Sequence, residues 1–184
     1  MKKIILASKS PRREELLRRL VENFAIEESG IDEESSETDP DQLACRLAEM
    51  KARDVFARSQ DAVVIGADTV VAVDGKLLGK PRDEADAREM IALLAGRTHS
   101  VHTGVCVVAE GFCKTVCCKT LVTFDEMSGE DVDDYIAAGD YRDKAGAYGI
   151  QGAAAKHISG ICGDYYNVVG LPVHALYKVL KEIL

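Results

Sequence analysis

The chain has 184 residues, a length that suits one domain with a substantial core or with two lobes around a cleft, and we expect a single domain over residues 1–184. Its formal net charge of −8 at pH 7 excludes the broad basic surface that nucleic-acid binding needs. No apolar run approaches the length of a membrane span, and no signal-peptide core follows Met1. The sequence therefore predicts a soluble, cytoplasmic protein that binds neither nucleic acid nor membranes.

The six cysteines are typical of reduced thiols in a chain without a secretory signal. Cys113, Cys117 and Cys118 come closest to a metal-binding cluster. They lie in an alternating, strand-like stretch, where the first two share one face and the third takes the other. Because the chain has no CxxC pair, this spacing favours small buried apolar side chains over zinc ligands.

The first predicted elements are a strand over residues 4–7 and a helix that begins after Ser10. Ser10 is a favoured N-cap residue, and Pro11 takes the first helical position, where proline is well tolerated. The hydroxyls of Ser8 and Ser10 thus lie beside the unpaired N–H groups of a helix start. Such a site is suited to binding an anion.

Positive charge at this helix start is unexpected for a purely structural element. Arg12 and Arg13 fall in the first turn beside Lys9, where each cation should destabilise the helix by roughly 0.3–1 kcal/mol. A bound phosphate would reverse the sign of that effect. The alternative is that both arginines point into solvent or pair with Glu14 and Glu15. We favour the anion site.

The next segments combine an acidic loop with a long helix. Residues 24–26 predict a short strand, and residues 27–39 a serine-rich, acidic and largely solvated loop, in which Glu33 is a carboxylate that the fold could hold. Asp39, followed by proline, predicts the start of a helix. The apolar stripe of that helix is predicted at Leu43, Leu47 and Met50.

Two charged residues in this part of the chain call for an explanation. Lys51 lies at the edge of the apolar stripe, where a lysine taken alone is best explained by a side chain that extends along the surface to solvent. Asp68 interrupts an apolar run that extends over residues 62–73, and burying its carboxylate is costly unless it is paired, hydrogen-bonded or metal-bound. A structural aspartate held by neighbouring N–H groups is an equally good explanation of Asp68.

The remaining elements alternate between helices and strands. Asp74 and Gly75 predict a hairpin turn, after which Lys80 lies at a strand end close to a loop. Residues 143–152 are rich in glycine, as expected where backbone approaches a flat ligand, and Tyr148 and Ile150 argue against a flexible linker. The other predicted elements are a helix capped by Asp83 that ends at Gly96, antiparallel strands over residues 99–109 and 113–124, a helix from Ser128 to Gly139, strands over residues 156–161 and 165–169, and a final helix after Pro172.

Five sequence blocks, in one order and at compatible spacing, resemble the Maf family of nucleoside triphosphate pyrophosphatases. The resemblance extends from Ile4 to about Leu176 and is more specific than any one block. The blocks are LASKSPRREELL at residues 6–17, GADTVV at 66–71, LGKP at 78–81, DKAGAYGIQG at 143–152 and YYNVVGLP at 165–172.

The resemblance implies a mixed-sheet α/β fold of two lobes around a central substrate cleft, similar to the inosine triphosphate pyrophosphatases. It also implies a homodimer that depends on a divalent cation, Mg²⁺ or Mn²⁺. The implied reaction cleaves a nucleoside triphosphate between the α- and β-phosphates, giving a monophosphate and pyrophosphate. A triphosphate carries about four negative charges, so neutralisation and positioning are most of the catalytic task, and clustered cations at a helix start suit it.

Individual roles follow from the same resemblance. Asp68 takes the position of the catalytic carboxylate, and Glu33 that of an acidic partner near the metal. We therefore predict that Asp68 and Glu33 hold the cation, while water is activated either by the metal or by Asp68 as a general base. The predicted substrate-binding residues are Ser8, Ser10, Arg12, Arg13, Lys51, Thr69, Lys80 and Gln151.

Substrate choice is implied by three positions. Arg12, Thr69 and Gln151 match the trio that marks the branch acting on thymidine and uridine triphosphates, and not the sister branch acting on 7-methyl-GTP. An amide and a hydroxyl can read the O4 and N3–H edge of uracil or thymine, with a discrimination of roughly 1–3 kcal/mol. Because an amide can flip, rejection of CTP is a weaker prediction than rejection of purines, and modified pyrimidine triphosphates are further candidates.

Two other functions would use the same cleft. One is a non-catalytic nucleotide-binding regulator, for instance of cell division and septum formation, and the other is a phosphatase that releases orthophosphate. A pure sensor would not require the set Asp68, Glu33, Lys51 and Lys80. Incubation with UTP and magnesium separates the three functions, because they predict pyrophosphate, no product and orthophosphate, respectively.

Overall fold

The computed structural model describes residues 2–33 and 35–183, so residue 34 of the predicted acidic loop lies outside the described part. Its strands are β1 (Ile4–Leu6), β2 (Ala25–Ile26), β3 (Val63–Val73), β4 (Lys76–Leu78), β5 (Thr98–Ala109), β6 (Phe112–Phe124) and β7 (Ile158–Cys162). Its α-helices are α1 (Pro11–Leu17), α2 (Pro40–Arg58), α3 (Glu84–Leu94), α4 (Gly129–Ala137), α5 (Tyr165–Val169) and α6 (Val173–Leu180), with short 3₁₀ helices at Ala145–Ala147 and Ala153–His157.

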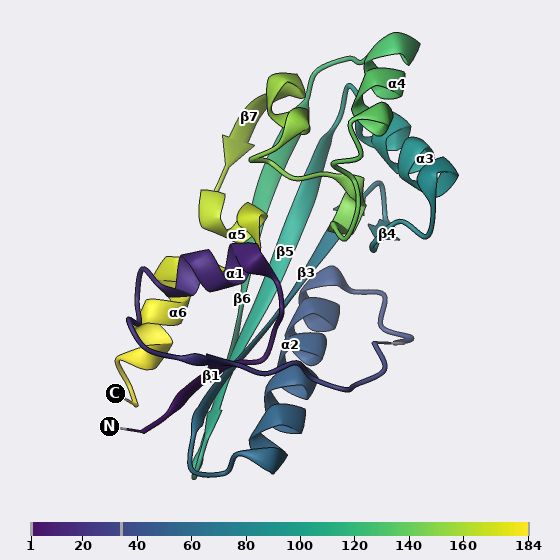
Figure 1. Ribbon diagram of the computed structural model, residues 1–184. Helices are drawn as coiled ribbons and strands as arrows, with labels where there is room; N and C mark the ends of the chain where they lie inside the picture. Colours follow the sequence, from purple (N-terminus) through teal and green to yellow (C-terminus); the bar gives the residue numbers. More distant parts are fainter. Residues whose placement is uncertain (1, 34, 184) are drawn as a thin grey trace.

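The described strands form one seven-stranded sheet in the order β2-β1-β3-β5-β6-β7, with β4 also paired to β3. β1 runs parallel to β2 and β3, and the other pairs are antiparallel. Figure 1 shows the long β5 and β6 as the axis of the molecule, with α2 on one side and α1, α5 and α6 on the other. The predicted mixed-sheet α/β class is confirmed.

One edge of β3 is open in its middle. On one side β3 pairs continuously with β5, from Val64 to Ala72. On the other side, β1 pairs with residues 63–65 and β4 with residues 71–73. Within the described chain, residues 66–70 therefore face no strand along that edge. The gap lies beyond the carboxyl end of β1, where ligands commonly bind in α/β proteins.

The two faces of the sheet carry separate cores. α2 covers one face, where its Ala48 and Val55 pack with Val64 and Cys106 of the sheet. α1, α3, α4 and α6 contribute to a larger core on the other face. Because side chains alternate along a strand, neighbouring residues of β3 reach opposite cores. The open edge of β3 is thus accessible from both layers.

Glycines bring α2 unusually close to the sheet. A Cβ atom added at Gly66 would lie 2.2 Å from the carbonyl oxygen of Ala48, and one at Gly104 would lie 2.3 Å from that of Ala44. Helix backbone therefore packs directly on strand backbone. Four of the six buried side chains of α2 are correspondingly small, those of Ala44, Ala48, Ala52 and Val55, and the other two are Leu47 and Lys51.

This packing corrects two sequence predictions for α2. Of the predicted stripe only Leu47 is buried, while Leu43 and Met50 are half-buried, since the close approach admits small side chains best. Lys51 does not extend along the surface to solvent. It is 7% exposed and lies inside the molecule.

Local signals predicted most helix starts. Ser10, Asp39, Asp83 and Ser128 are all N-caps whose side chains accept a hydrogen bond from the following turn, as predicted. The hairpin at Asp74 is also confirmed, with β4 pairing back onto β3. None of the described helices has the length and apolar character needed to cross a membrane.

The predicted strand over residues 165–169 is wrong, because this segment is the helix α5. Asp164 Oδ1 accepts a hydrogen bond from the Tyr166 N–H at 2.8 Å and caps the helix, while Gly170, with φ of 121°, ends it. Asn167 anchors the helix by donating to β5 and β6 at 3.0 Å. The β-propensity of tyrosine and valine is thus overridden by a cap and a buried amide. The preceding strand, β7, begins two residues later than predicted.

Candidate active site

A cavity of about 820 Å³ lies at the open edge of β3. It is bounded by the turn between β1 and α1, by α2, by the loop after β4 and by the loop over residues 143–152. All the residues predicted to bind substrate or metal line it: Ser8, Ser10, Arg12, Arg13, Glu33, Lys51, Asp68, Thr69, Lys80 and Gln151.

Lys51 joins two carboxylates in this cavity. Its Nζ atom lies 2.6 Å from Asp68 Oδ1 and 2.9 Å from Glu33 Oε1. Asp68 comes from the middle of β3 and is 8% exposed, whereas about half of the Glu33 side chain is exposed. Two negative charges and one positive charge leave this cluster with an excess negative charge when all three groups are ionised. The buried carboxylate of Asp68 is thus paired with a charge, and not held only by N–H groups.

Glu33 remains a carboxylate despite its partial burial. Burial acts to raise the pKa of Glu33, but the hydrogen bond from Lys51 and the charges of Lys51, Lys80 and Arg13 outweigh it and lower the pKa below its usual value. The sign of the shift shows that cations from three parts of the chain act on one acidic group. Glu33 is therefore ionised at neutral pH and can bind a cation.

Arg13 is held by three acceptors from different segments. Its Nε donates to the Gly170 carbonyl at 2.9 Å, Nη1 donates to Ser8 Oγ at 3.4 Å, and Nη2 donates to Thr69 Oγ1 at 3.1 Å. Burial lowers the pKa of Arg13, an effect opposed by the charge of Asp68, and a guanidinium stays protonated under such conditions. Arg13 therefore fixes the geometry of the cavity wall as well as its charge.

The Thr69 hydroxyl continues this hydrogen-bond chain. It lies 3.0 Å from Thr103 Oγ1, and Thr103 donates its own proton to the Asn167 carbonyl at 2.9 Å. Thr69 must therefore be the donor to Thr103, which leaves its lone pairs for Arg13. Asp68 and Thr69 point to opposite faces of the sheet, so the cavity extends around the edge of β3.

The helix start has the predicted cap, and its arginines avoid the acidic residues that follow them. Ser10 Oγ accepts from the Arg13 N–H at 3.4 Å, and Ser8 Oγ accepts from the Ser10 N–H at 3.2 Å. The two following glutamates pair with Arg18 at 2.7 Å and Arg19 at 3.4 Å, which lie just after the end of α1. Pairing with those glutamates therefore does not explain the cations of the first turn.

The glycine-rich loop is tied to the core and to the Lys80 segment. The Gly146 N–H donates to the Gly79 carbonyl at 3.0 Å, next to Lys80. Tyr148 Oη lies 2.7 Å from His99 Nε2 on β5. Burial lowers the pKa of His99 to about 4 and raises the pKa of Tyr148. These contacts make the loop an ordered wall and not a linker.

Sequence reasoning missed an ion pair in the same wall. Asp140 and Lys144 both line the cavity, with Lys144 Nζ 3.0 Å from Asp140 Oδ1. The available signal was their spacing of four residues, which often places opposite charges together. This spacing predicts an ion pair only in a helix, and the segment is a turn in the structure.

The donor set fits a hard divalent cation. Asp68 and Glu33 supply carboxylate oxygens close together, and Mg²⁺ commonly binds one or two carboxylates and completes its coordination with substrate phosphates. The described residues contain no group of three or more histidine, cysteine or acidic side chains placed to hold a metal by themselves. All six cysteines are free thiols, but the three that we expected to be buried are not: Cys113 is exposed, and Cys117 and Cys118 are half-buried.

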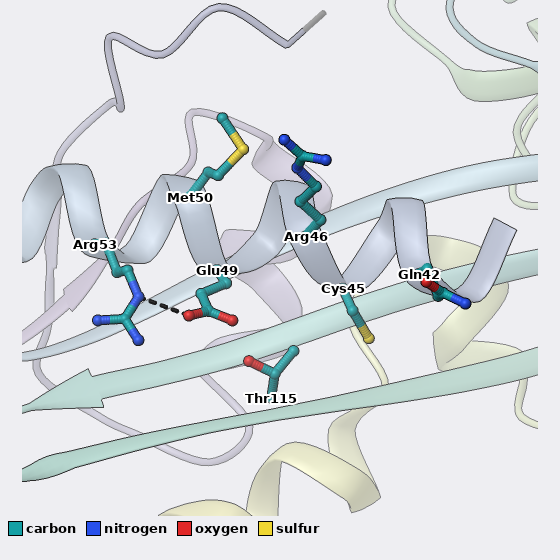
Figure 2. A pocket seen from close by; sticks show the side chains of 7 residues that line it. All are labelled: Gln42, Cys45, Arg46, Glu49, Met50, Arg53 and Thr115. Atoms are coloured by element: carbon teal, nitrogen blue, oxygen red, sulfur yellow. Dashed lines mark hydrogen bonds and ion pairs between the residues drawn. The ribbon is translucent and has the colours of Figure 1, made fainter. Parts of the chain in front are cut away.

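A second, shallower pocket of about 530 Å³ lies where α2 meets β6, and none of the predicted site residues line it. Figure 2 shows Arg53 and Glu49 as an ion pair there, with Nε and Oε1 2.6 Å apart, while Arg46 and Met50 point away from the strands. The residues that line this pocket are Gln42, Cys45, Arg46, Glu49, Met50, Arg53 and Thr115.

Comparison with known proteins adds evidence of relationship. A family model described as Maf-like protein matches residues 3–183. The chain is 47% identical over 180 residues to the dTTP/UTP pyrophosphatase of Thermococcus gammatolerans, covering 98% of this chain and 96% of that protein. It is 48% identical over 180 residues to that of Koribacter versatilis, with 97% and 93% covered, and 48% identical over 183 residues to that of Symbiobacterium thermophilum, with 99% and 94% covered.

Proposed function

The chain belongs to the Maf family, and from this we propose that it is a nucleoside triphosphate pyrophosphatase that hydrolyses dTTP and UTP to the monophosphate and pyrophosphate. The relatives named above carry that activity in their names and match along nearly their whole length. CTP and modified pyrimidine triphosphates are weaker candidate substrates, because a side-chain amide can flip to match cytosine.

One observation carries the proposal: Lys51 joins Asp68 and Glu33 inside a cavity that several further cations also line. An arrangement with acidic groups at one place and cations around it matches a polyphosphate with a divalent cation. It also gives the buried Asp68 carboxylate a chemical use. A cavity of about 820 Å³ is large enough for a nucleotide-sized ligand.

In the proposed mechanism, substrate phosphate oxygens compete for the Lys51 ammonium and free Asp68 to act as a general base. Asp68 accepts a proton from the attacking water, whose oxygen forms a bond to the α-phosphorus. The bond from that phosphorus to the bridging oxygen breaks, and pyrophosphate leaves with the electron pair. A Mg²⁺ or Mn²⁺ ion held by Asp68 and Glu33 would supply charge neutralisation and polarise the α-phosphate.

We assign the remaining predicted residues either to phosphate binding or to recognition of the base. Arg12, Lys80 and Lys51 bind the phosphates, while the helix start at Ser10 offers backbone N–H groups. The Gln151 amide reads the pyrimidine edge. Arg13 holds the Thr69 hydroxyl in place at 3.1 Å, and this contact supports a role for both in shaping the base or sugar site.

The experiment incubates the protein with Mg²⁺ and a panel of triphosphates, and resolves the products by ion exchange. We expect dTTP and UTP to give monophosphate and pyrophosphate, with purine triphosphates much slower. Asp68→Asn should lower kcat by about 10²–10⁴-fold while nucleotide binding stays measurable. Asp61→Asn, at an exposed aspartate just before β3, is the matched control and should leave the rate unchanged.

Other outcomes contradict the proposal in distinct ways. Orthophosphate as the product would indicate a phosphatase. Tight UTP binding without turnover would indicate a regulatory nucleotide sensor, for which no contact in the cavity argues. Full activity of Asp68→Asn would remove this carboxylate from the chemistry.

Family membership also leads us to propose a homodimer in the cytoplasm, where nucleoside triphosphates are made and free thiols such as those of this chain stay reduced. Sedimentation equilibrium tests the dimer. A mass of one chain at micromolar concentration would contradict it.

A further inference from the structure

We propose that Asp140 is a positioning residue for base recognition, because its carboxylate holds both ends of the loop segment that carries Gln151. The proposal rests on the function proposed above, since it states how that site keeps its base-reading amide in place. Asp140 lies just before the glycine-rich loop and lines the same cavity.

The two oxygens of the Asp140 carboxylate hold different ends of the segment. At the first end, Lys144 Nζ lies 3.0 Å from Oδ1 and also donates to the Asp140 carbonyl at 2.5 Å. At the second end, the Ala153 N–H donates to Oδ2 at 2.9 Å. Gln151 lies between these ends, so one side chain closes the segment around it.

The backbone of the loop packs tightly against this ion pair. A Cβ atom added at Gly152 would lie 1.9 Å from Asp140 Oδ2, and one at Gly149 would lie 2.8 Å from the Cε atom of Lys144. The Gly152 N–H also donates to the Gly149 carbonyl at 3.1 Å, which closes a turn around Gln151. A side chain at 149 or 152 would therefore displace the Lys144 or Asp140 side chain of the ion pair on which the turn rests.

Separate contacts hold the two halves of the loop. Tyr135 Oη donates to the Ala147 carbonyl at 3.0 Å, and Gly146 bonds the Gly79 carbonyl, so the first half is tied to α4 and to the segment after β4. The half that contains Gln151 is held by Asp140 through Ala153. Only about a quarter of the Asp140 side chain and 15% of the Lys144 side chain are exposed, which limits competition from water. Loosening Asp140 should thus disturb Gln151 first.

The first variant is Asp140→Asn, which keeps the shape of the side chain. Its oxygen can still accept from Ala153, but its NH₂ group then faces the Lys144 ammonium, so that two donors meet. We expect the ratio of kcat/KM for UTP to that for GTP to fall about tenfold to a hundredfold, mainly through a higher KM for UTP. Asp134→Asn removes the same charge from an exposed position on α4 and should leave the ratio unchanged.

A double variant tests whether Asp140 acts through Gln151. Gln151→Ala should lower the same ratio, and Asp140→Asn combined with Gln151→Ala should lower it no further. Additive losses would overturn the proposal, because they would mean that Asp140 acts independently of the amide. An unchanged ratio in Asp140→Asn would overturn it as well.

A second variant disturbs the contact between the loop and the Asp140 carboxylate while Asp140 itself is unchanged. Gly152→Ala places a methyl group against Oδ2 and should reproduce the loss of selectivity, whereas Gly129→Ala, where a Cβ meets open space, should not. These two variants test the proposal independently, so it remains testable if Asp140→Asn folds poorly. Wild-type selectivity in Gly152→Ala would contradict the proposal.

Hydrogen exchange separates this proposal from the proposed function. In Asp140→Asn the amides of residues 149–153 should exchange at least tenfold faster than in Asp134→Asn, whether or not the protein hydrolyses UTP. Unchanged exchange overturns the role of Asp140 even in an active enzyme. A wild-type protein inactive on every triphosphate would instead refute the proposed function, and the exchange result would still decide whether Asp140 holds the loop.

Discussion

Lys51 on α2 and Asp68 on β3 form a buried ion pair, with Nζ 2.6 Å from Oδ1, across the interface where helix and sheet backbones touch. The pair lies at the open edge of the strand and shares its cation with Glu33. Lys51 of the helix layer thus contacts a residue in the middle of β3. The side chain extends this far because α2 packs closely on the sheet.

Removing the ammonium of this pair should destabilise the protein. Lys51→Met leaves the Asp68 carboxylate, which is 8% exposed, beside Glu33 without its cation. Breaking a buried pair in this way should lower the free energy of unfolding by about 3 kcal/mol. Adding Asp68→Asn to Lys51→Met should restore at least half of that loss, because the uncompensated charge disappears. Urea denaturation of the four proteins of the cycle measures the effect.

Lys178→Met, at an exposed lysine of α6, is the control for the loss of a positive charge and should change the unfolding free energy by less than about 0.5 kcal/mol. If Lys51→Met were as stable as the wild type, the ion pair would not contribute to the unfolding free energy. The presence of a buried lysine in the site would then need another explanation.

The close approach of α2 gives a second prediction. A Cβ atom at Gly104 would lie 2.3 Å from the Ala44 carbonyl oxygen and 2.6 Å from the Cys45 nitrogen, so Gly104→Ala must displace the helix backbone. We expect a loss of about 3 kcal/mol in unfolding free energy and a fall in UTP hydrolysis, since Lys51 moves with the helix. Gly160→Ala on β7 meets open space and should cost less than about 1 kcal/mol. Equal stability of the two variants would contradict direct backbone packing.

Features controlled by a few neighbouring residues could be predicted from the sequence. The N-caps at Ser10 and Asp39 depend on one side chain and the next turn, and the antiparallel pairing of β5 with β6 depends on a short turn between adjacent strands. The segment over residues 165–169 depends instead on where Asn167 finds its partners, which are residues of β5 and β6. Tertiary contacts made this segment a helix, whereas intrinsic propensity favoured a strand.

The candidate site shows the same division. The family resemblance predicted Asp68 and Lys51 as members of one site, but not that Lys51 would pair with both Asp68 and Glu33. That pairing depends on glycines of β3 and β5 that admit the helix, a relationship between segments distant in sequence. The role of Asp140 was equally hidden, because it depends on the path of a loop that returns to it.

The guanidinium of Arg13 should not be replaceable by an ammonium. It donates to three acceptors, the Gly170 carbonyl and the hydroxyls of Ser8 and Thr69, and a lysine offers one compact group that cannot reach all three. Arg13→Lys should therefore lower kcat/KM for UTP by at least tenfold and the unfolding free energy by about 1–3 kcal/mol. Steady-state kinetics and urea denaturation measure the two effects.

Arg18→Lys, at the C-cap residue of α1, is the matched control, because Arg18 is exposed and its guanidinium pairs with the single carboxylate of Glu14 at 2.7 Å. A lysine can keep such a surface pair, so both measurements should stay near wild type. If Arg13→Lys behaved like Arg18→Lys, the three-acceptor arrangement would have no consequence for the site.

His99 should make the protein less stable at mildly acidic pH. It is 2% exposed, its Nε2 bonds Tyr148 of the cavity wall, and its Nδ1 has no hydrogen-bond partner among the described residues. Burial lowers the pKa of His99 from 6.5 to about 4, so the folded state keeps it neutral where the unfolded state binds a proton. Its stabilising contribution is complete above pH 6.5 and is lost as the pH falls toward 4. Between pH 7.5 and 5.0 this one group should lower the unfolding free energy by about 2 kcal/mol.

His99→Gln tests this assignment, since its amide can still bond the Tyr148 hydroxyl but does not titrate in this range. The difference in unfolding free energy between pH 7.5 and 5.0, measured by urea denaturation, should shrink by about 2 kcal/mol in His99→Gln. His174→Gln, at an exposed histidine of α6, should keep the wild-type difference. A wild-type pH dependence in His99→Gln would show that groups other than His99 cause the acid sensitivity. The hydrogen bond between His99 and Tyr148 would then be equally stable at both pH values.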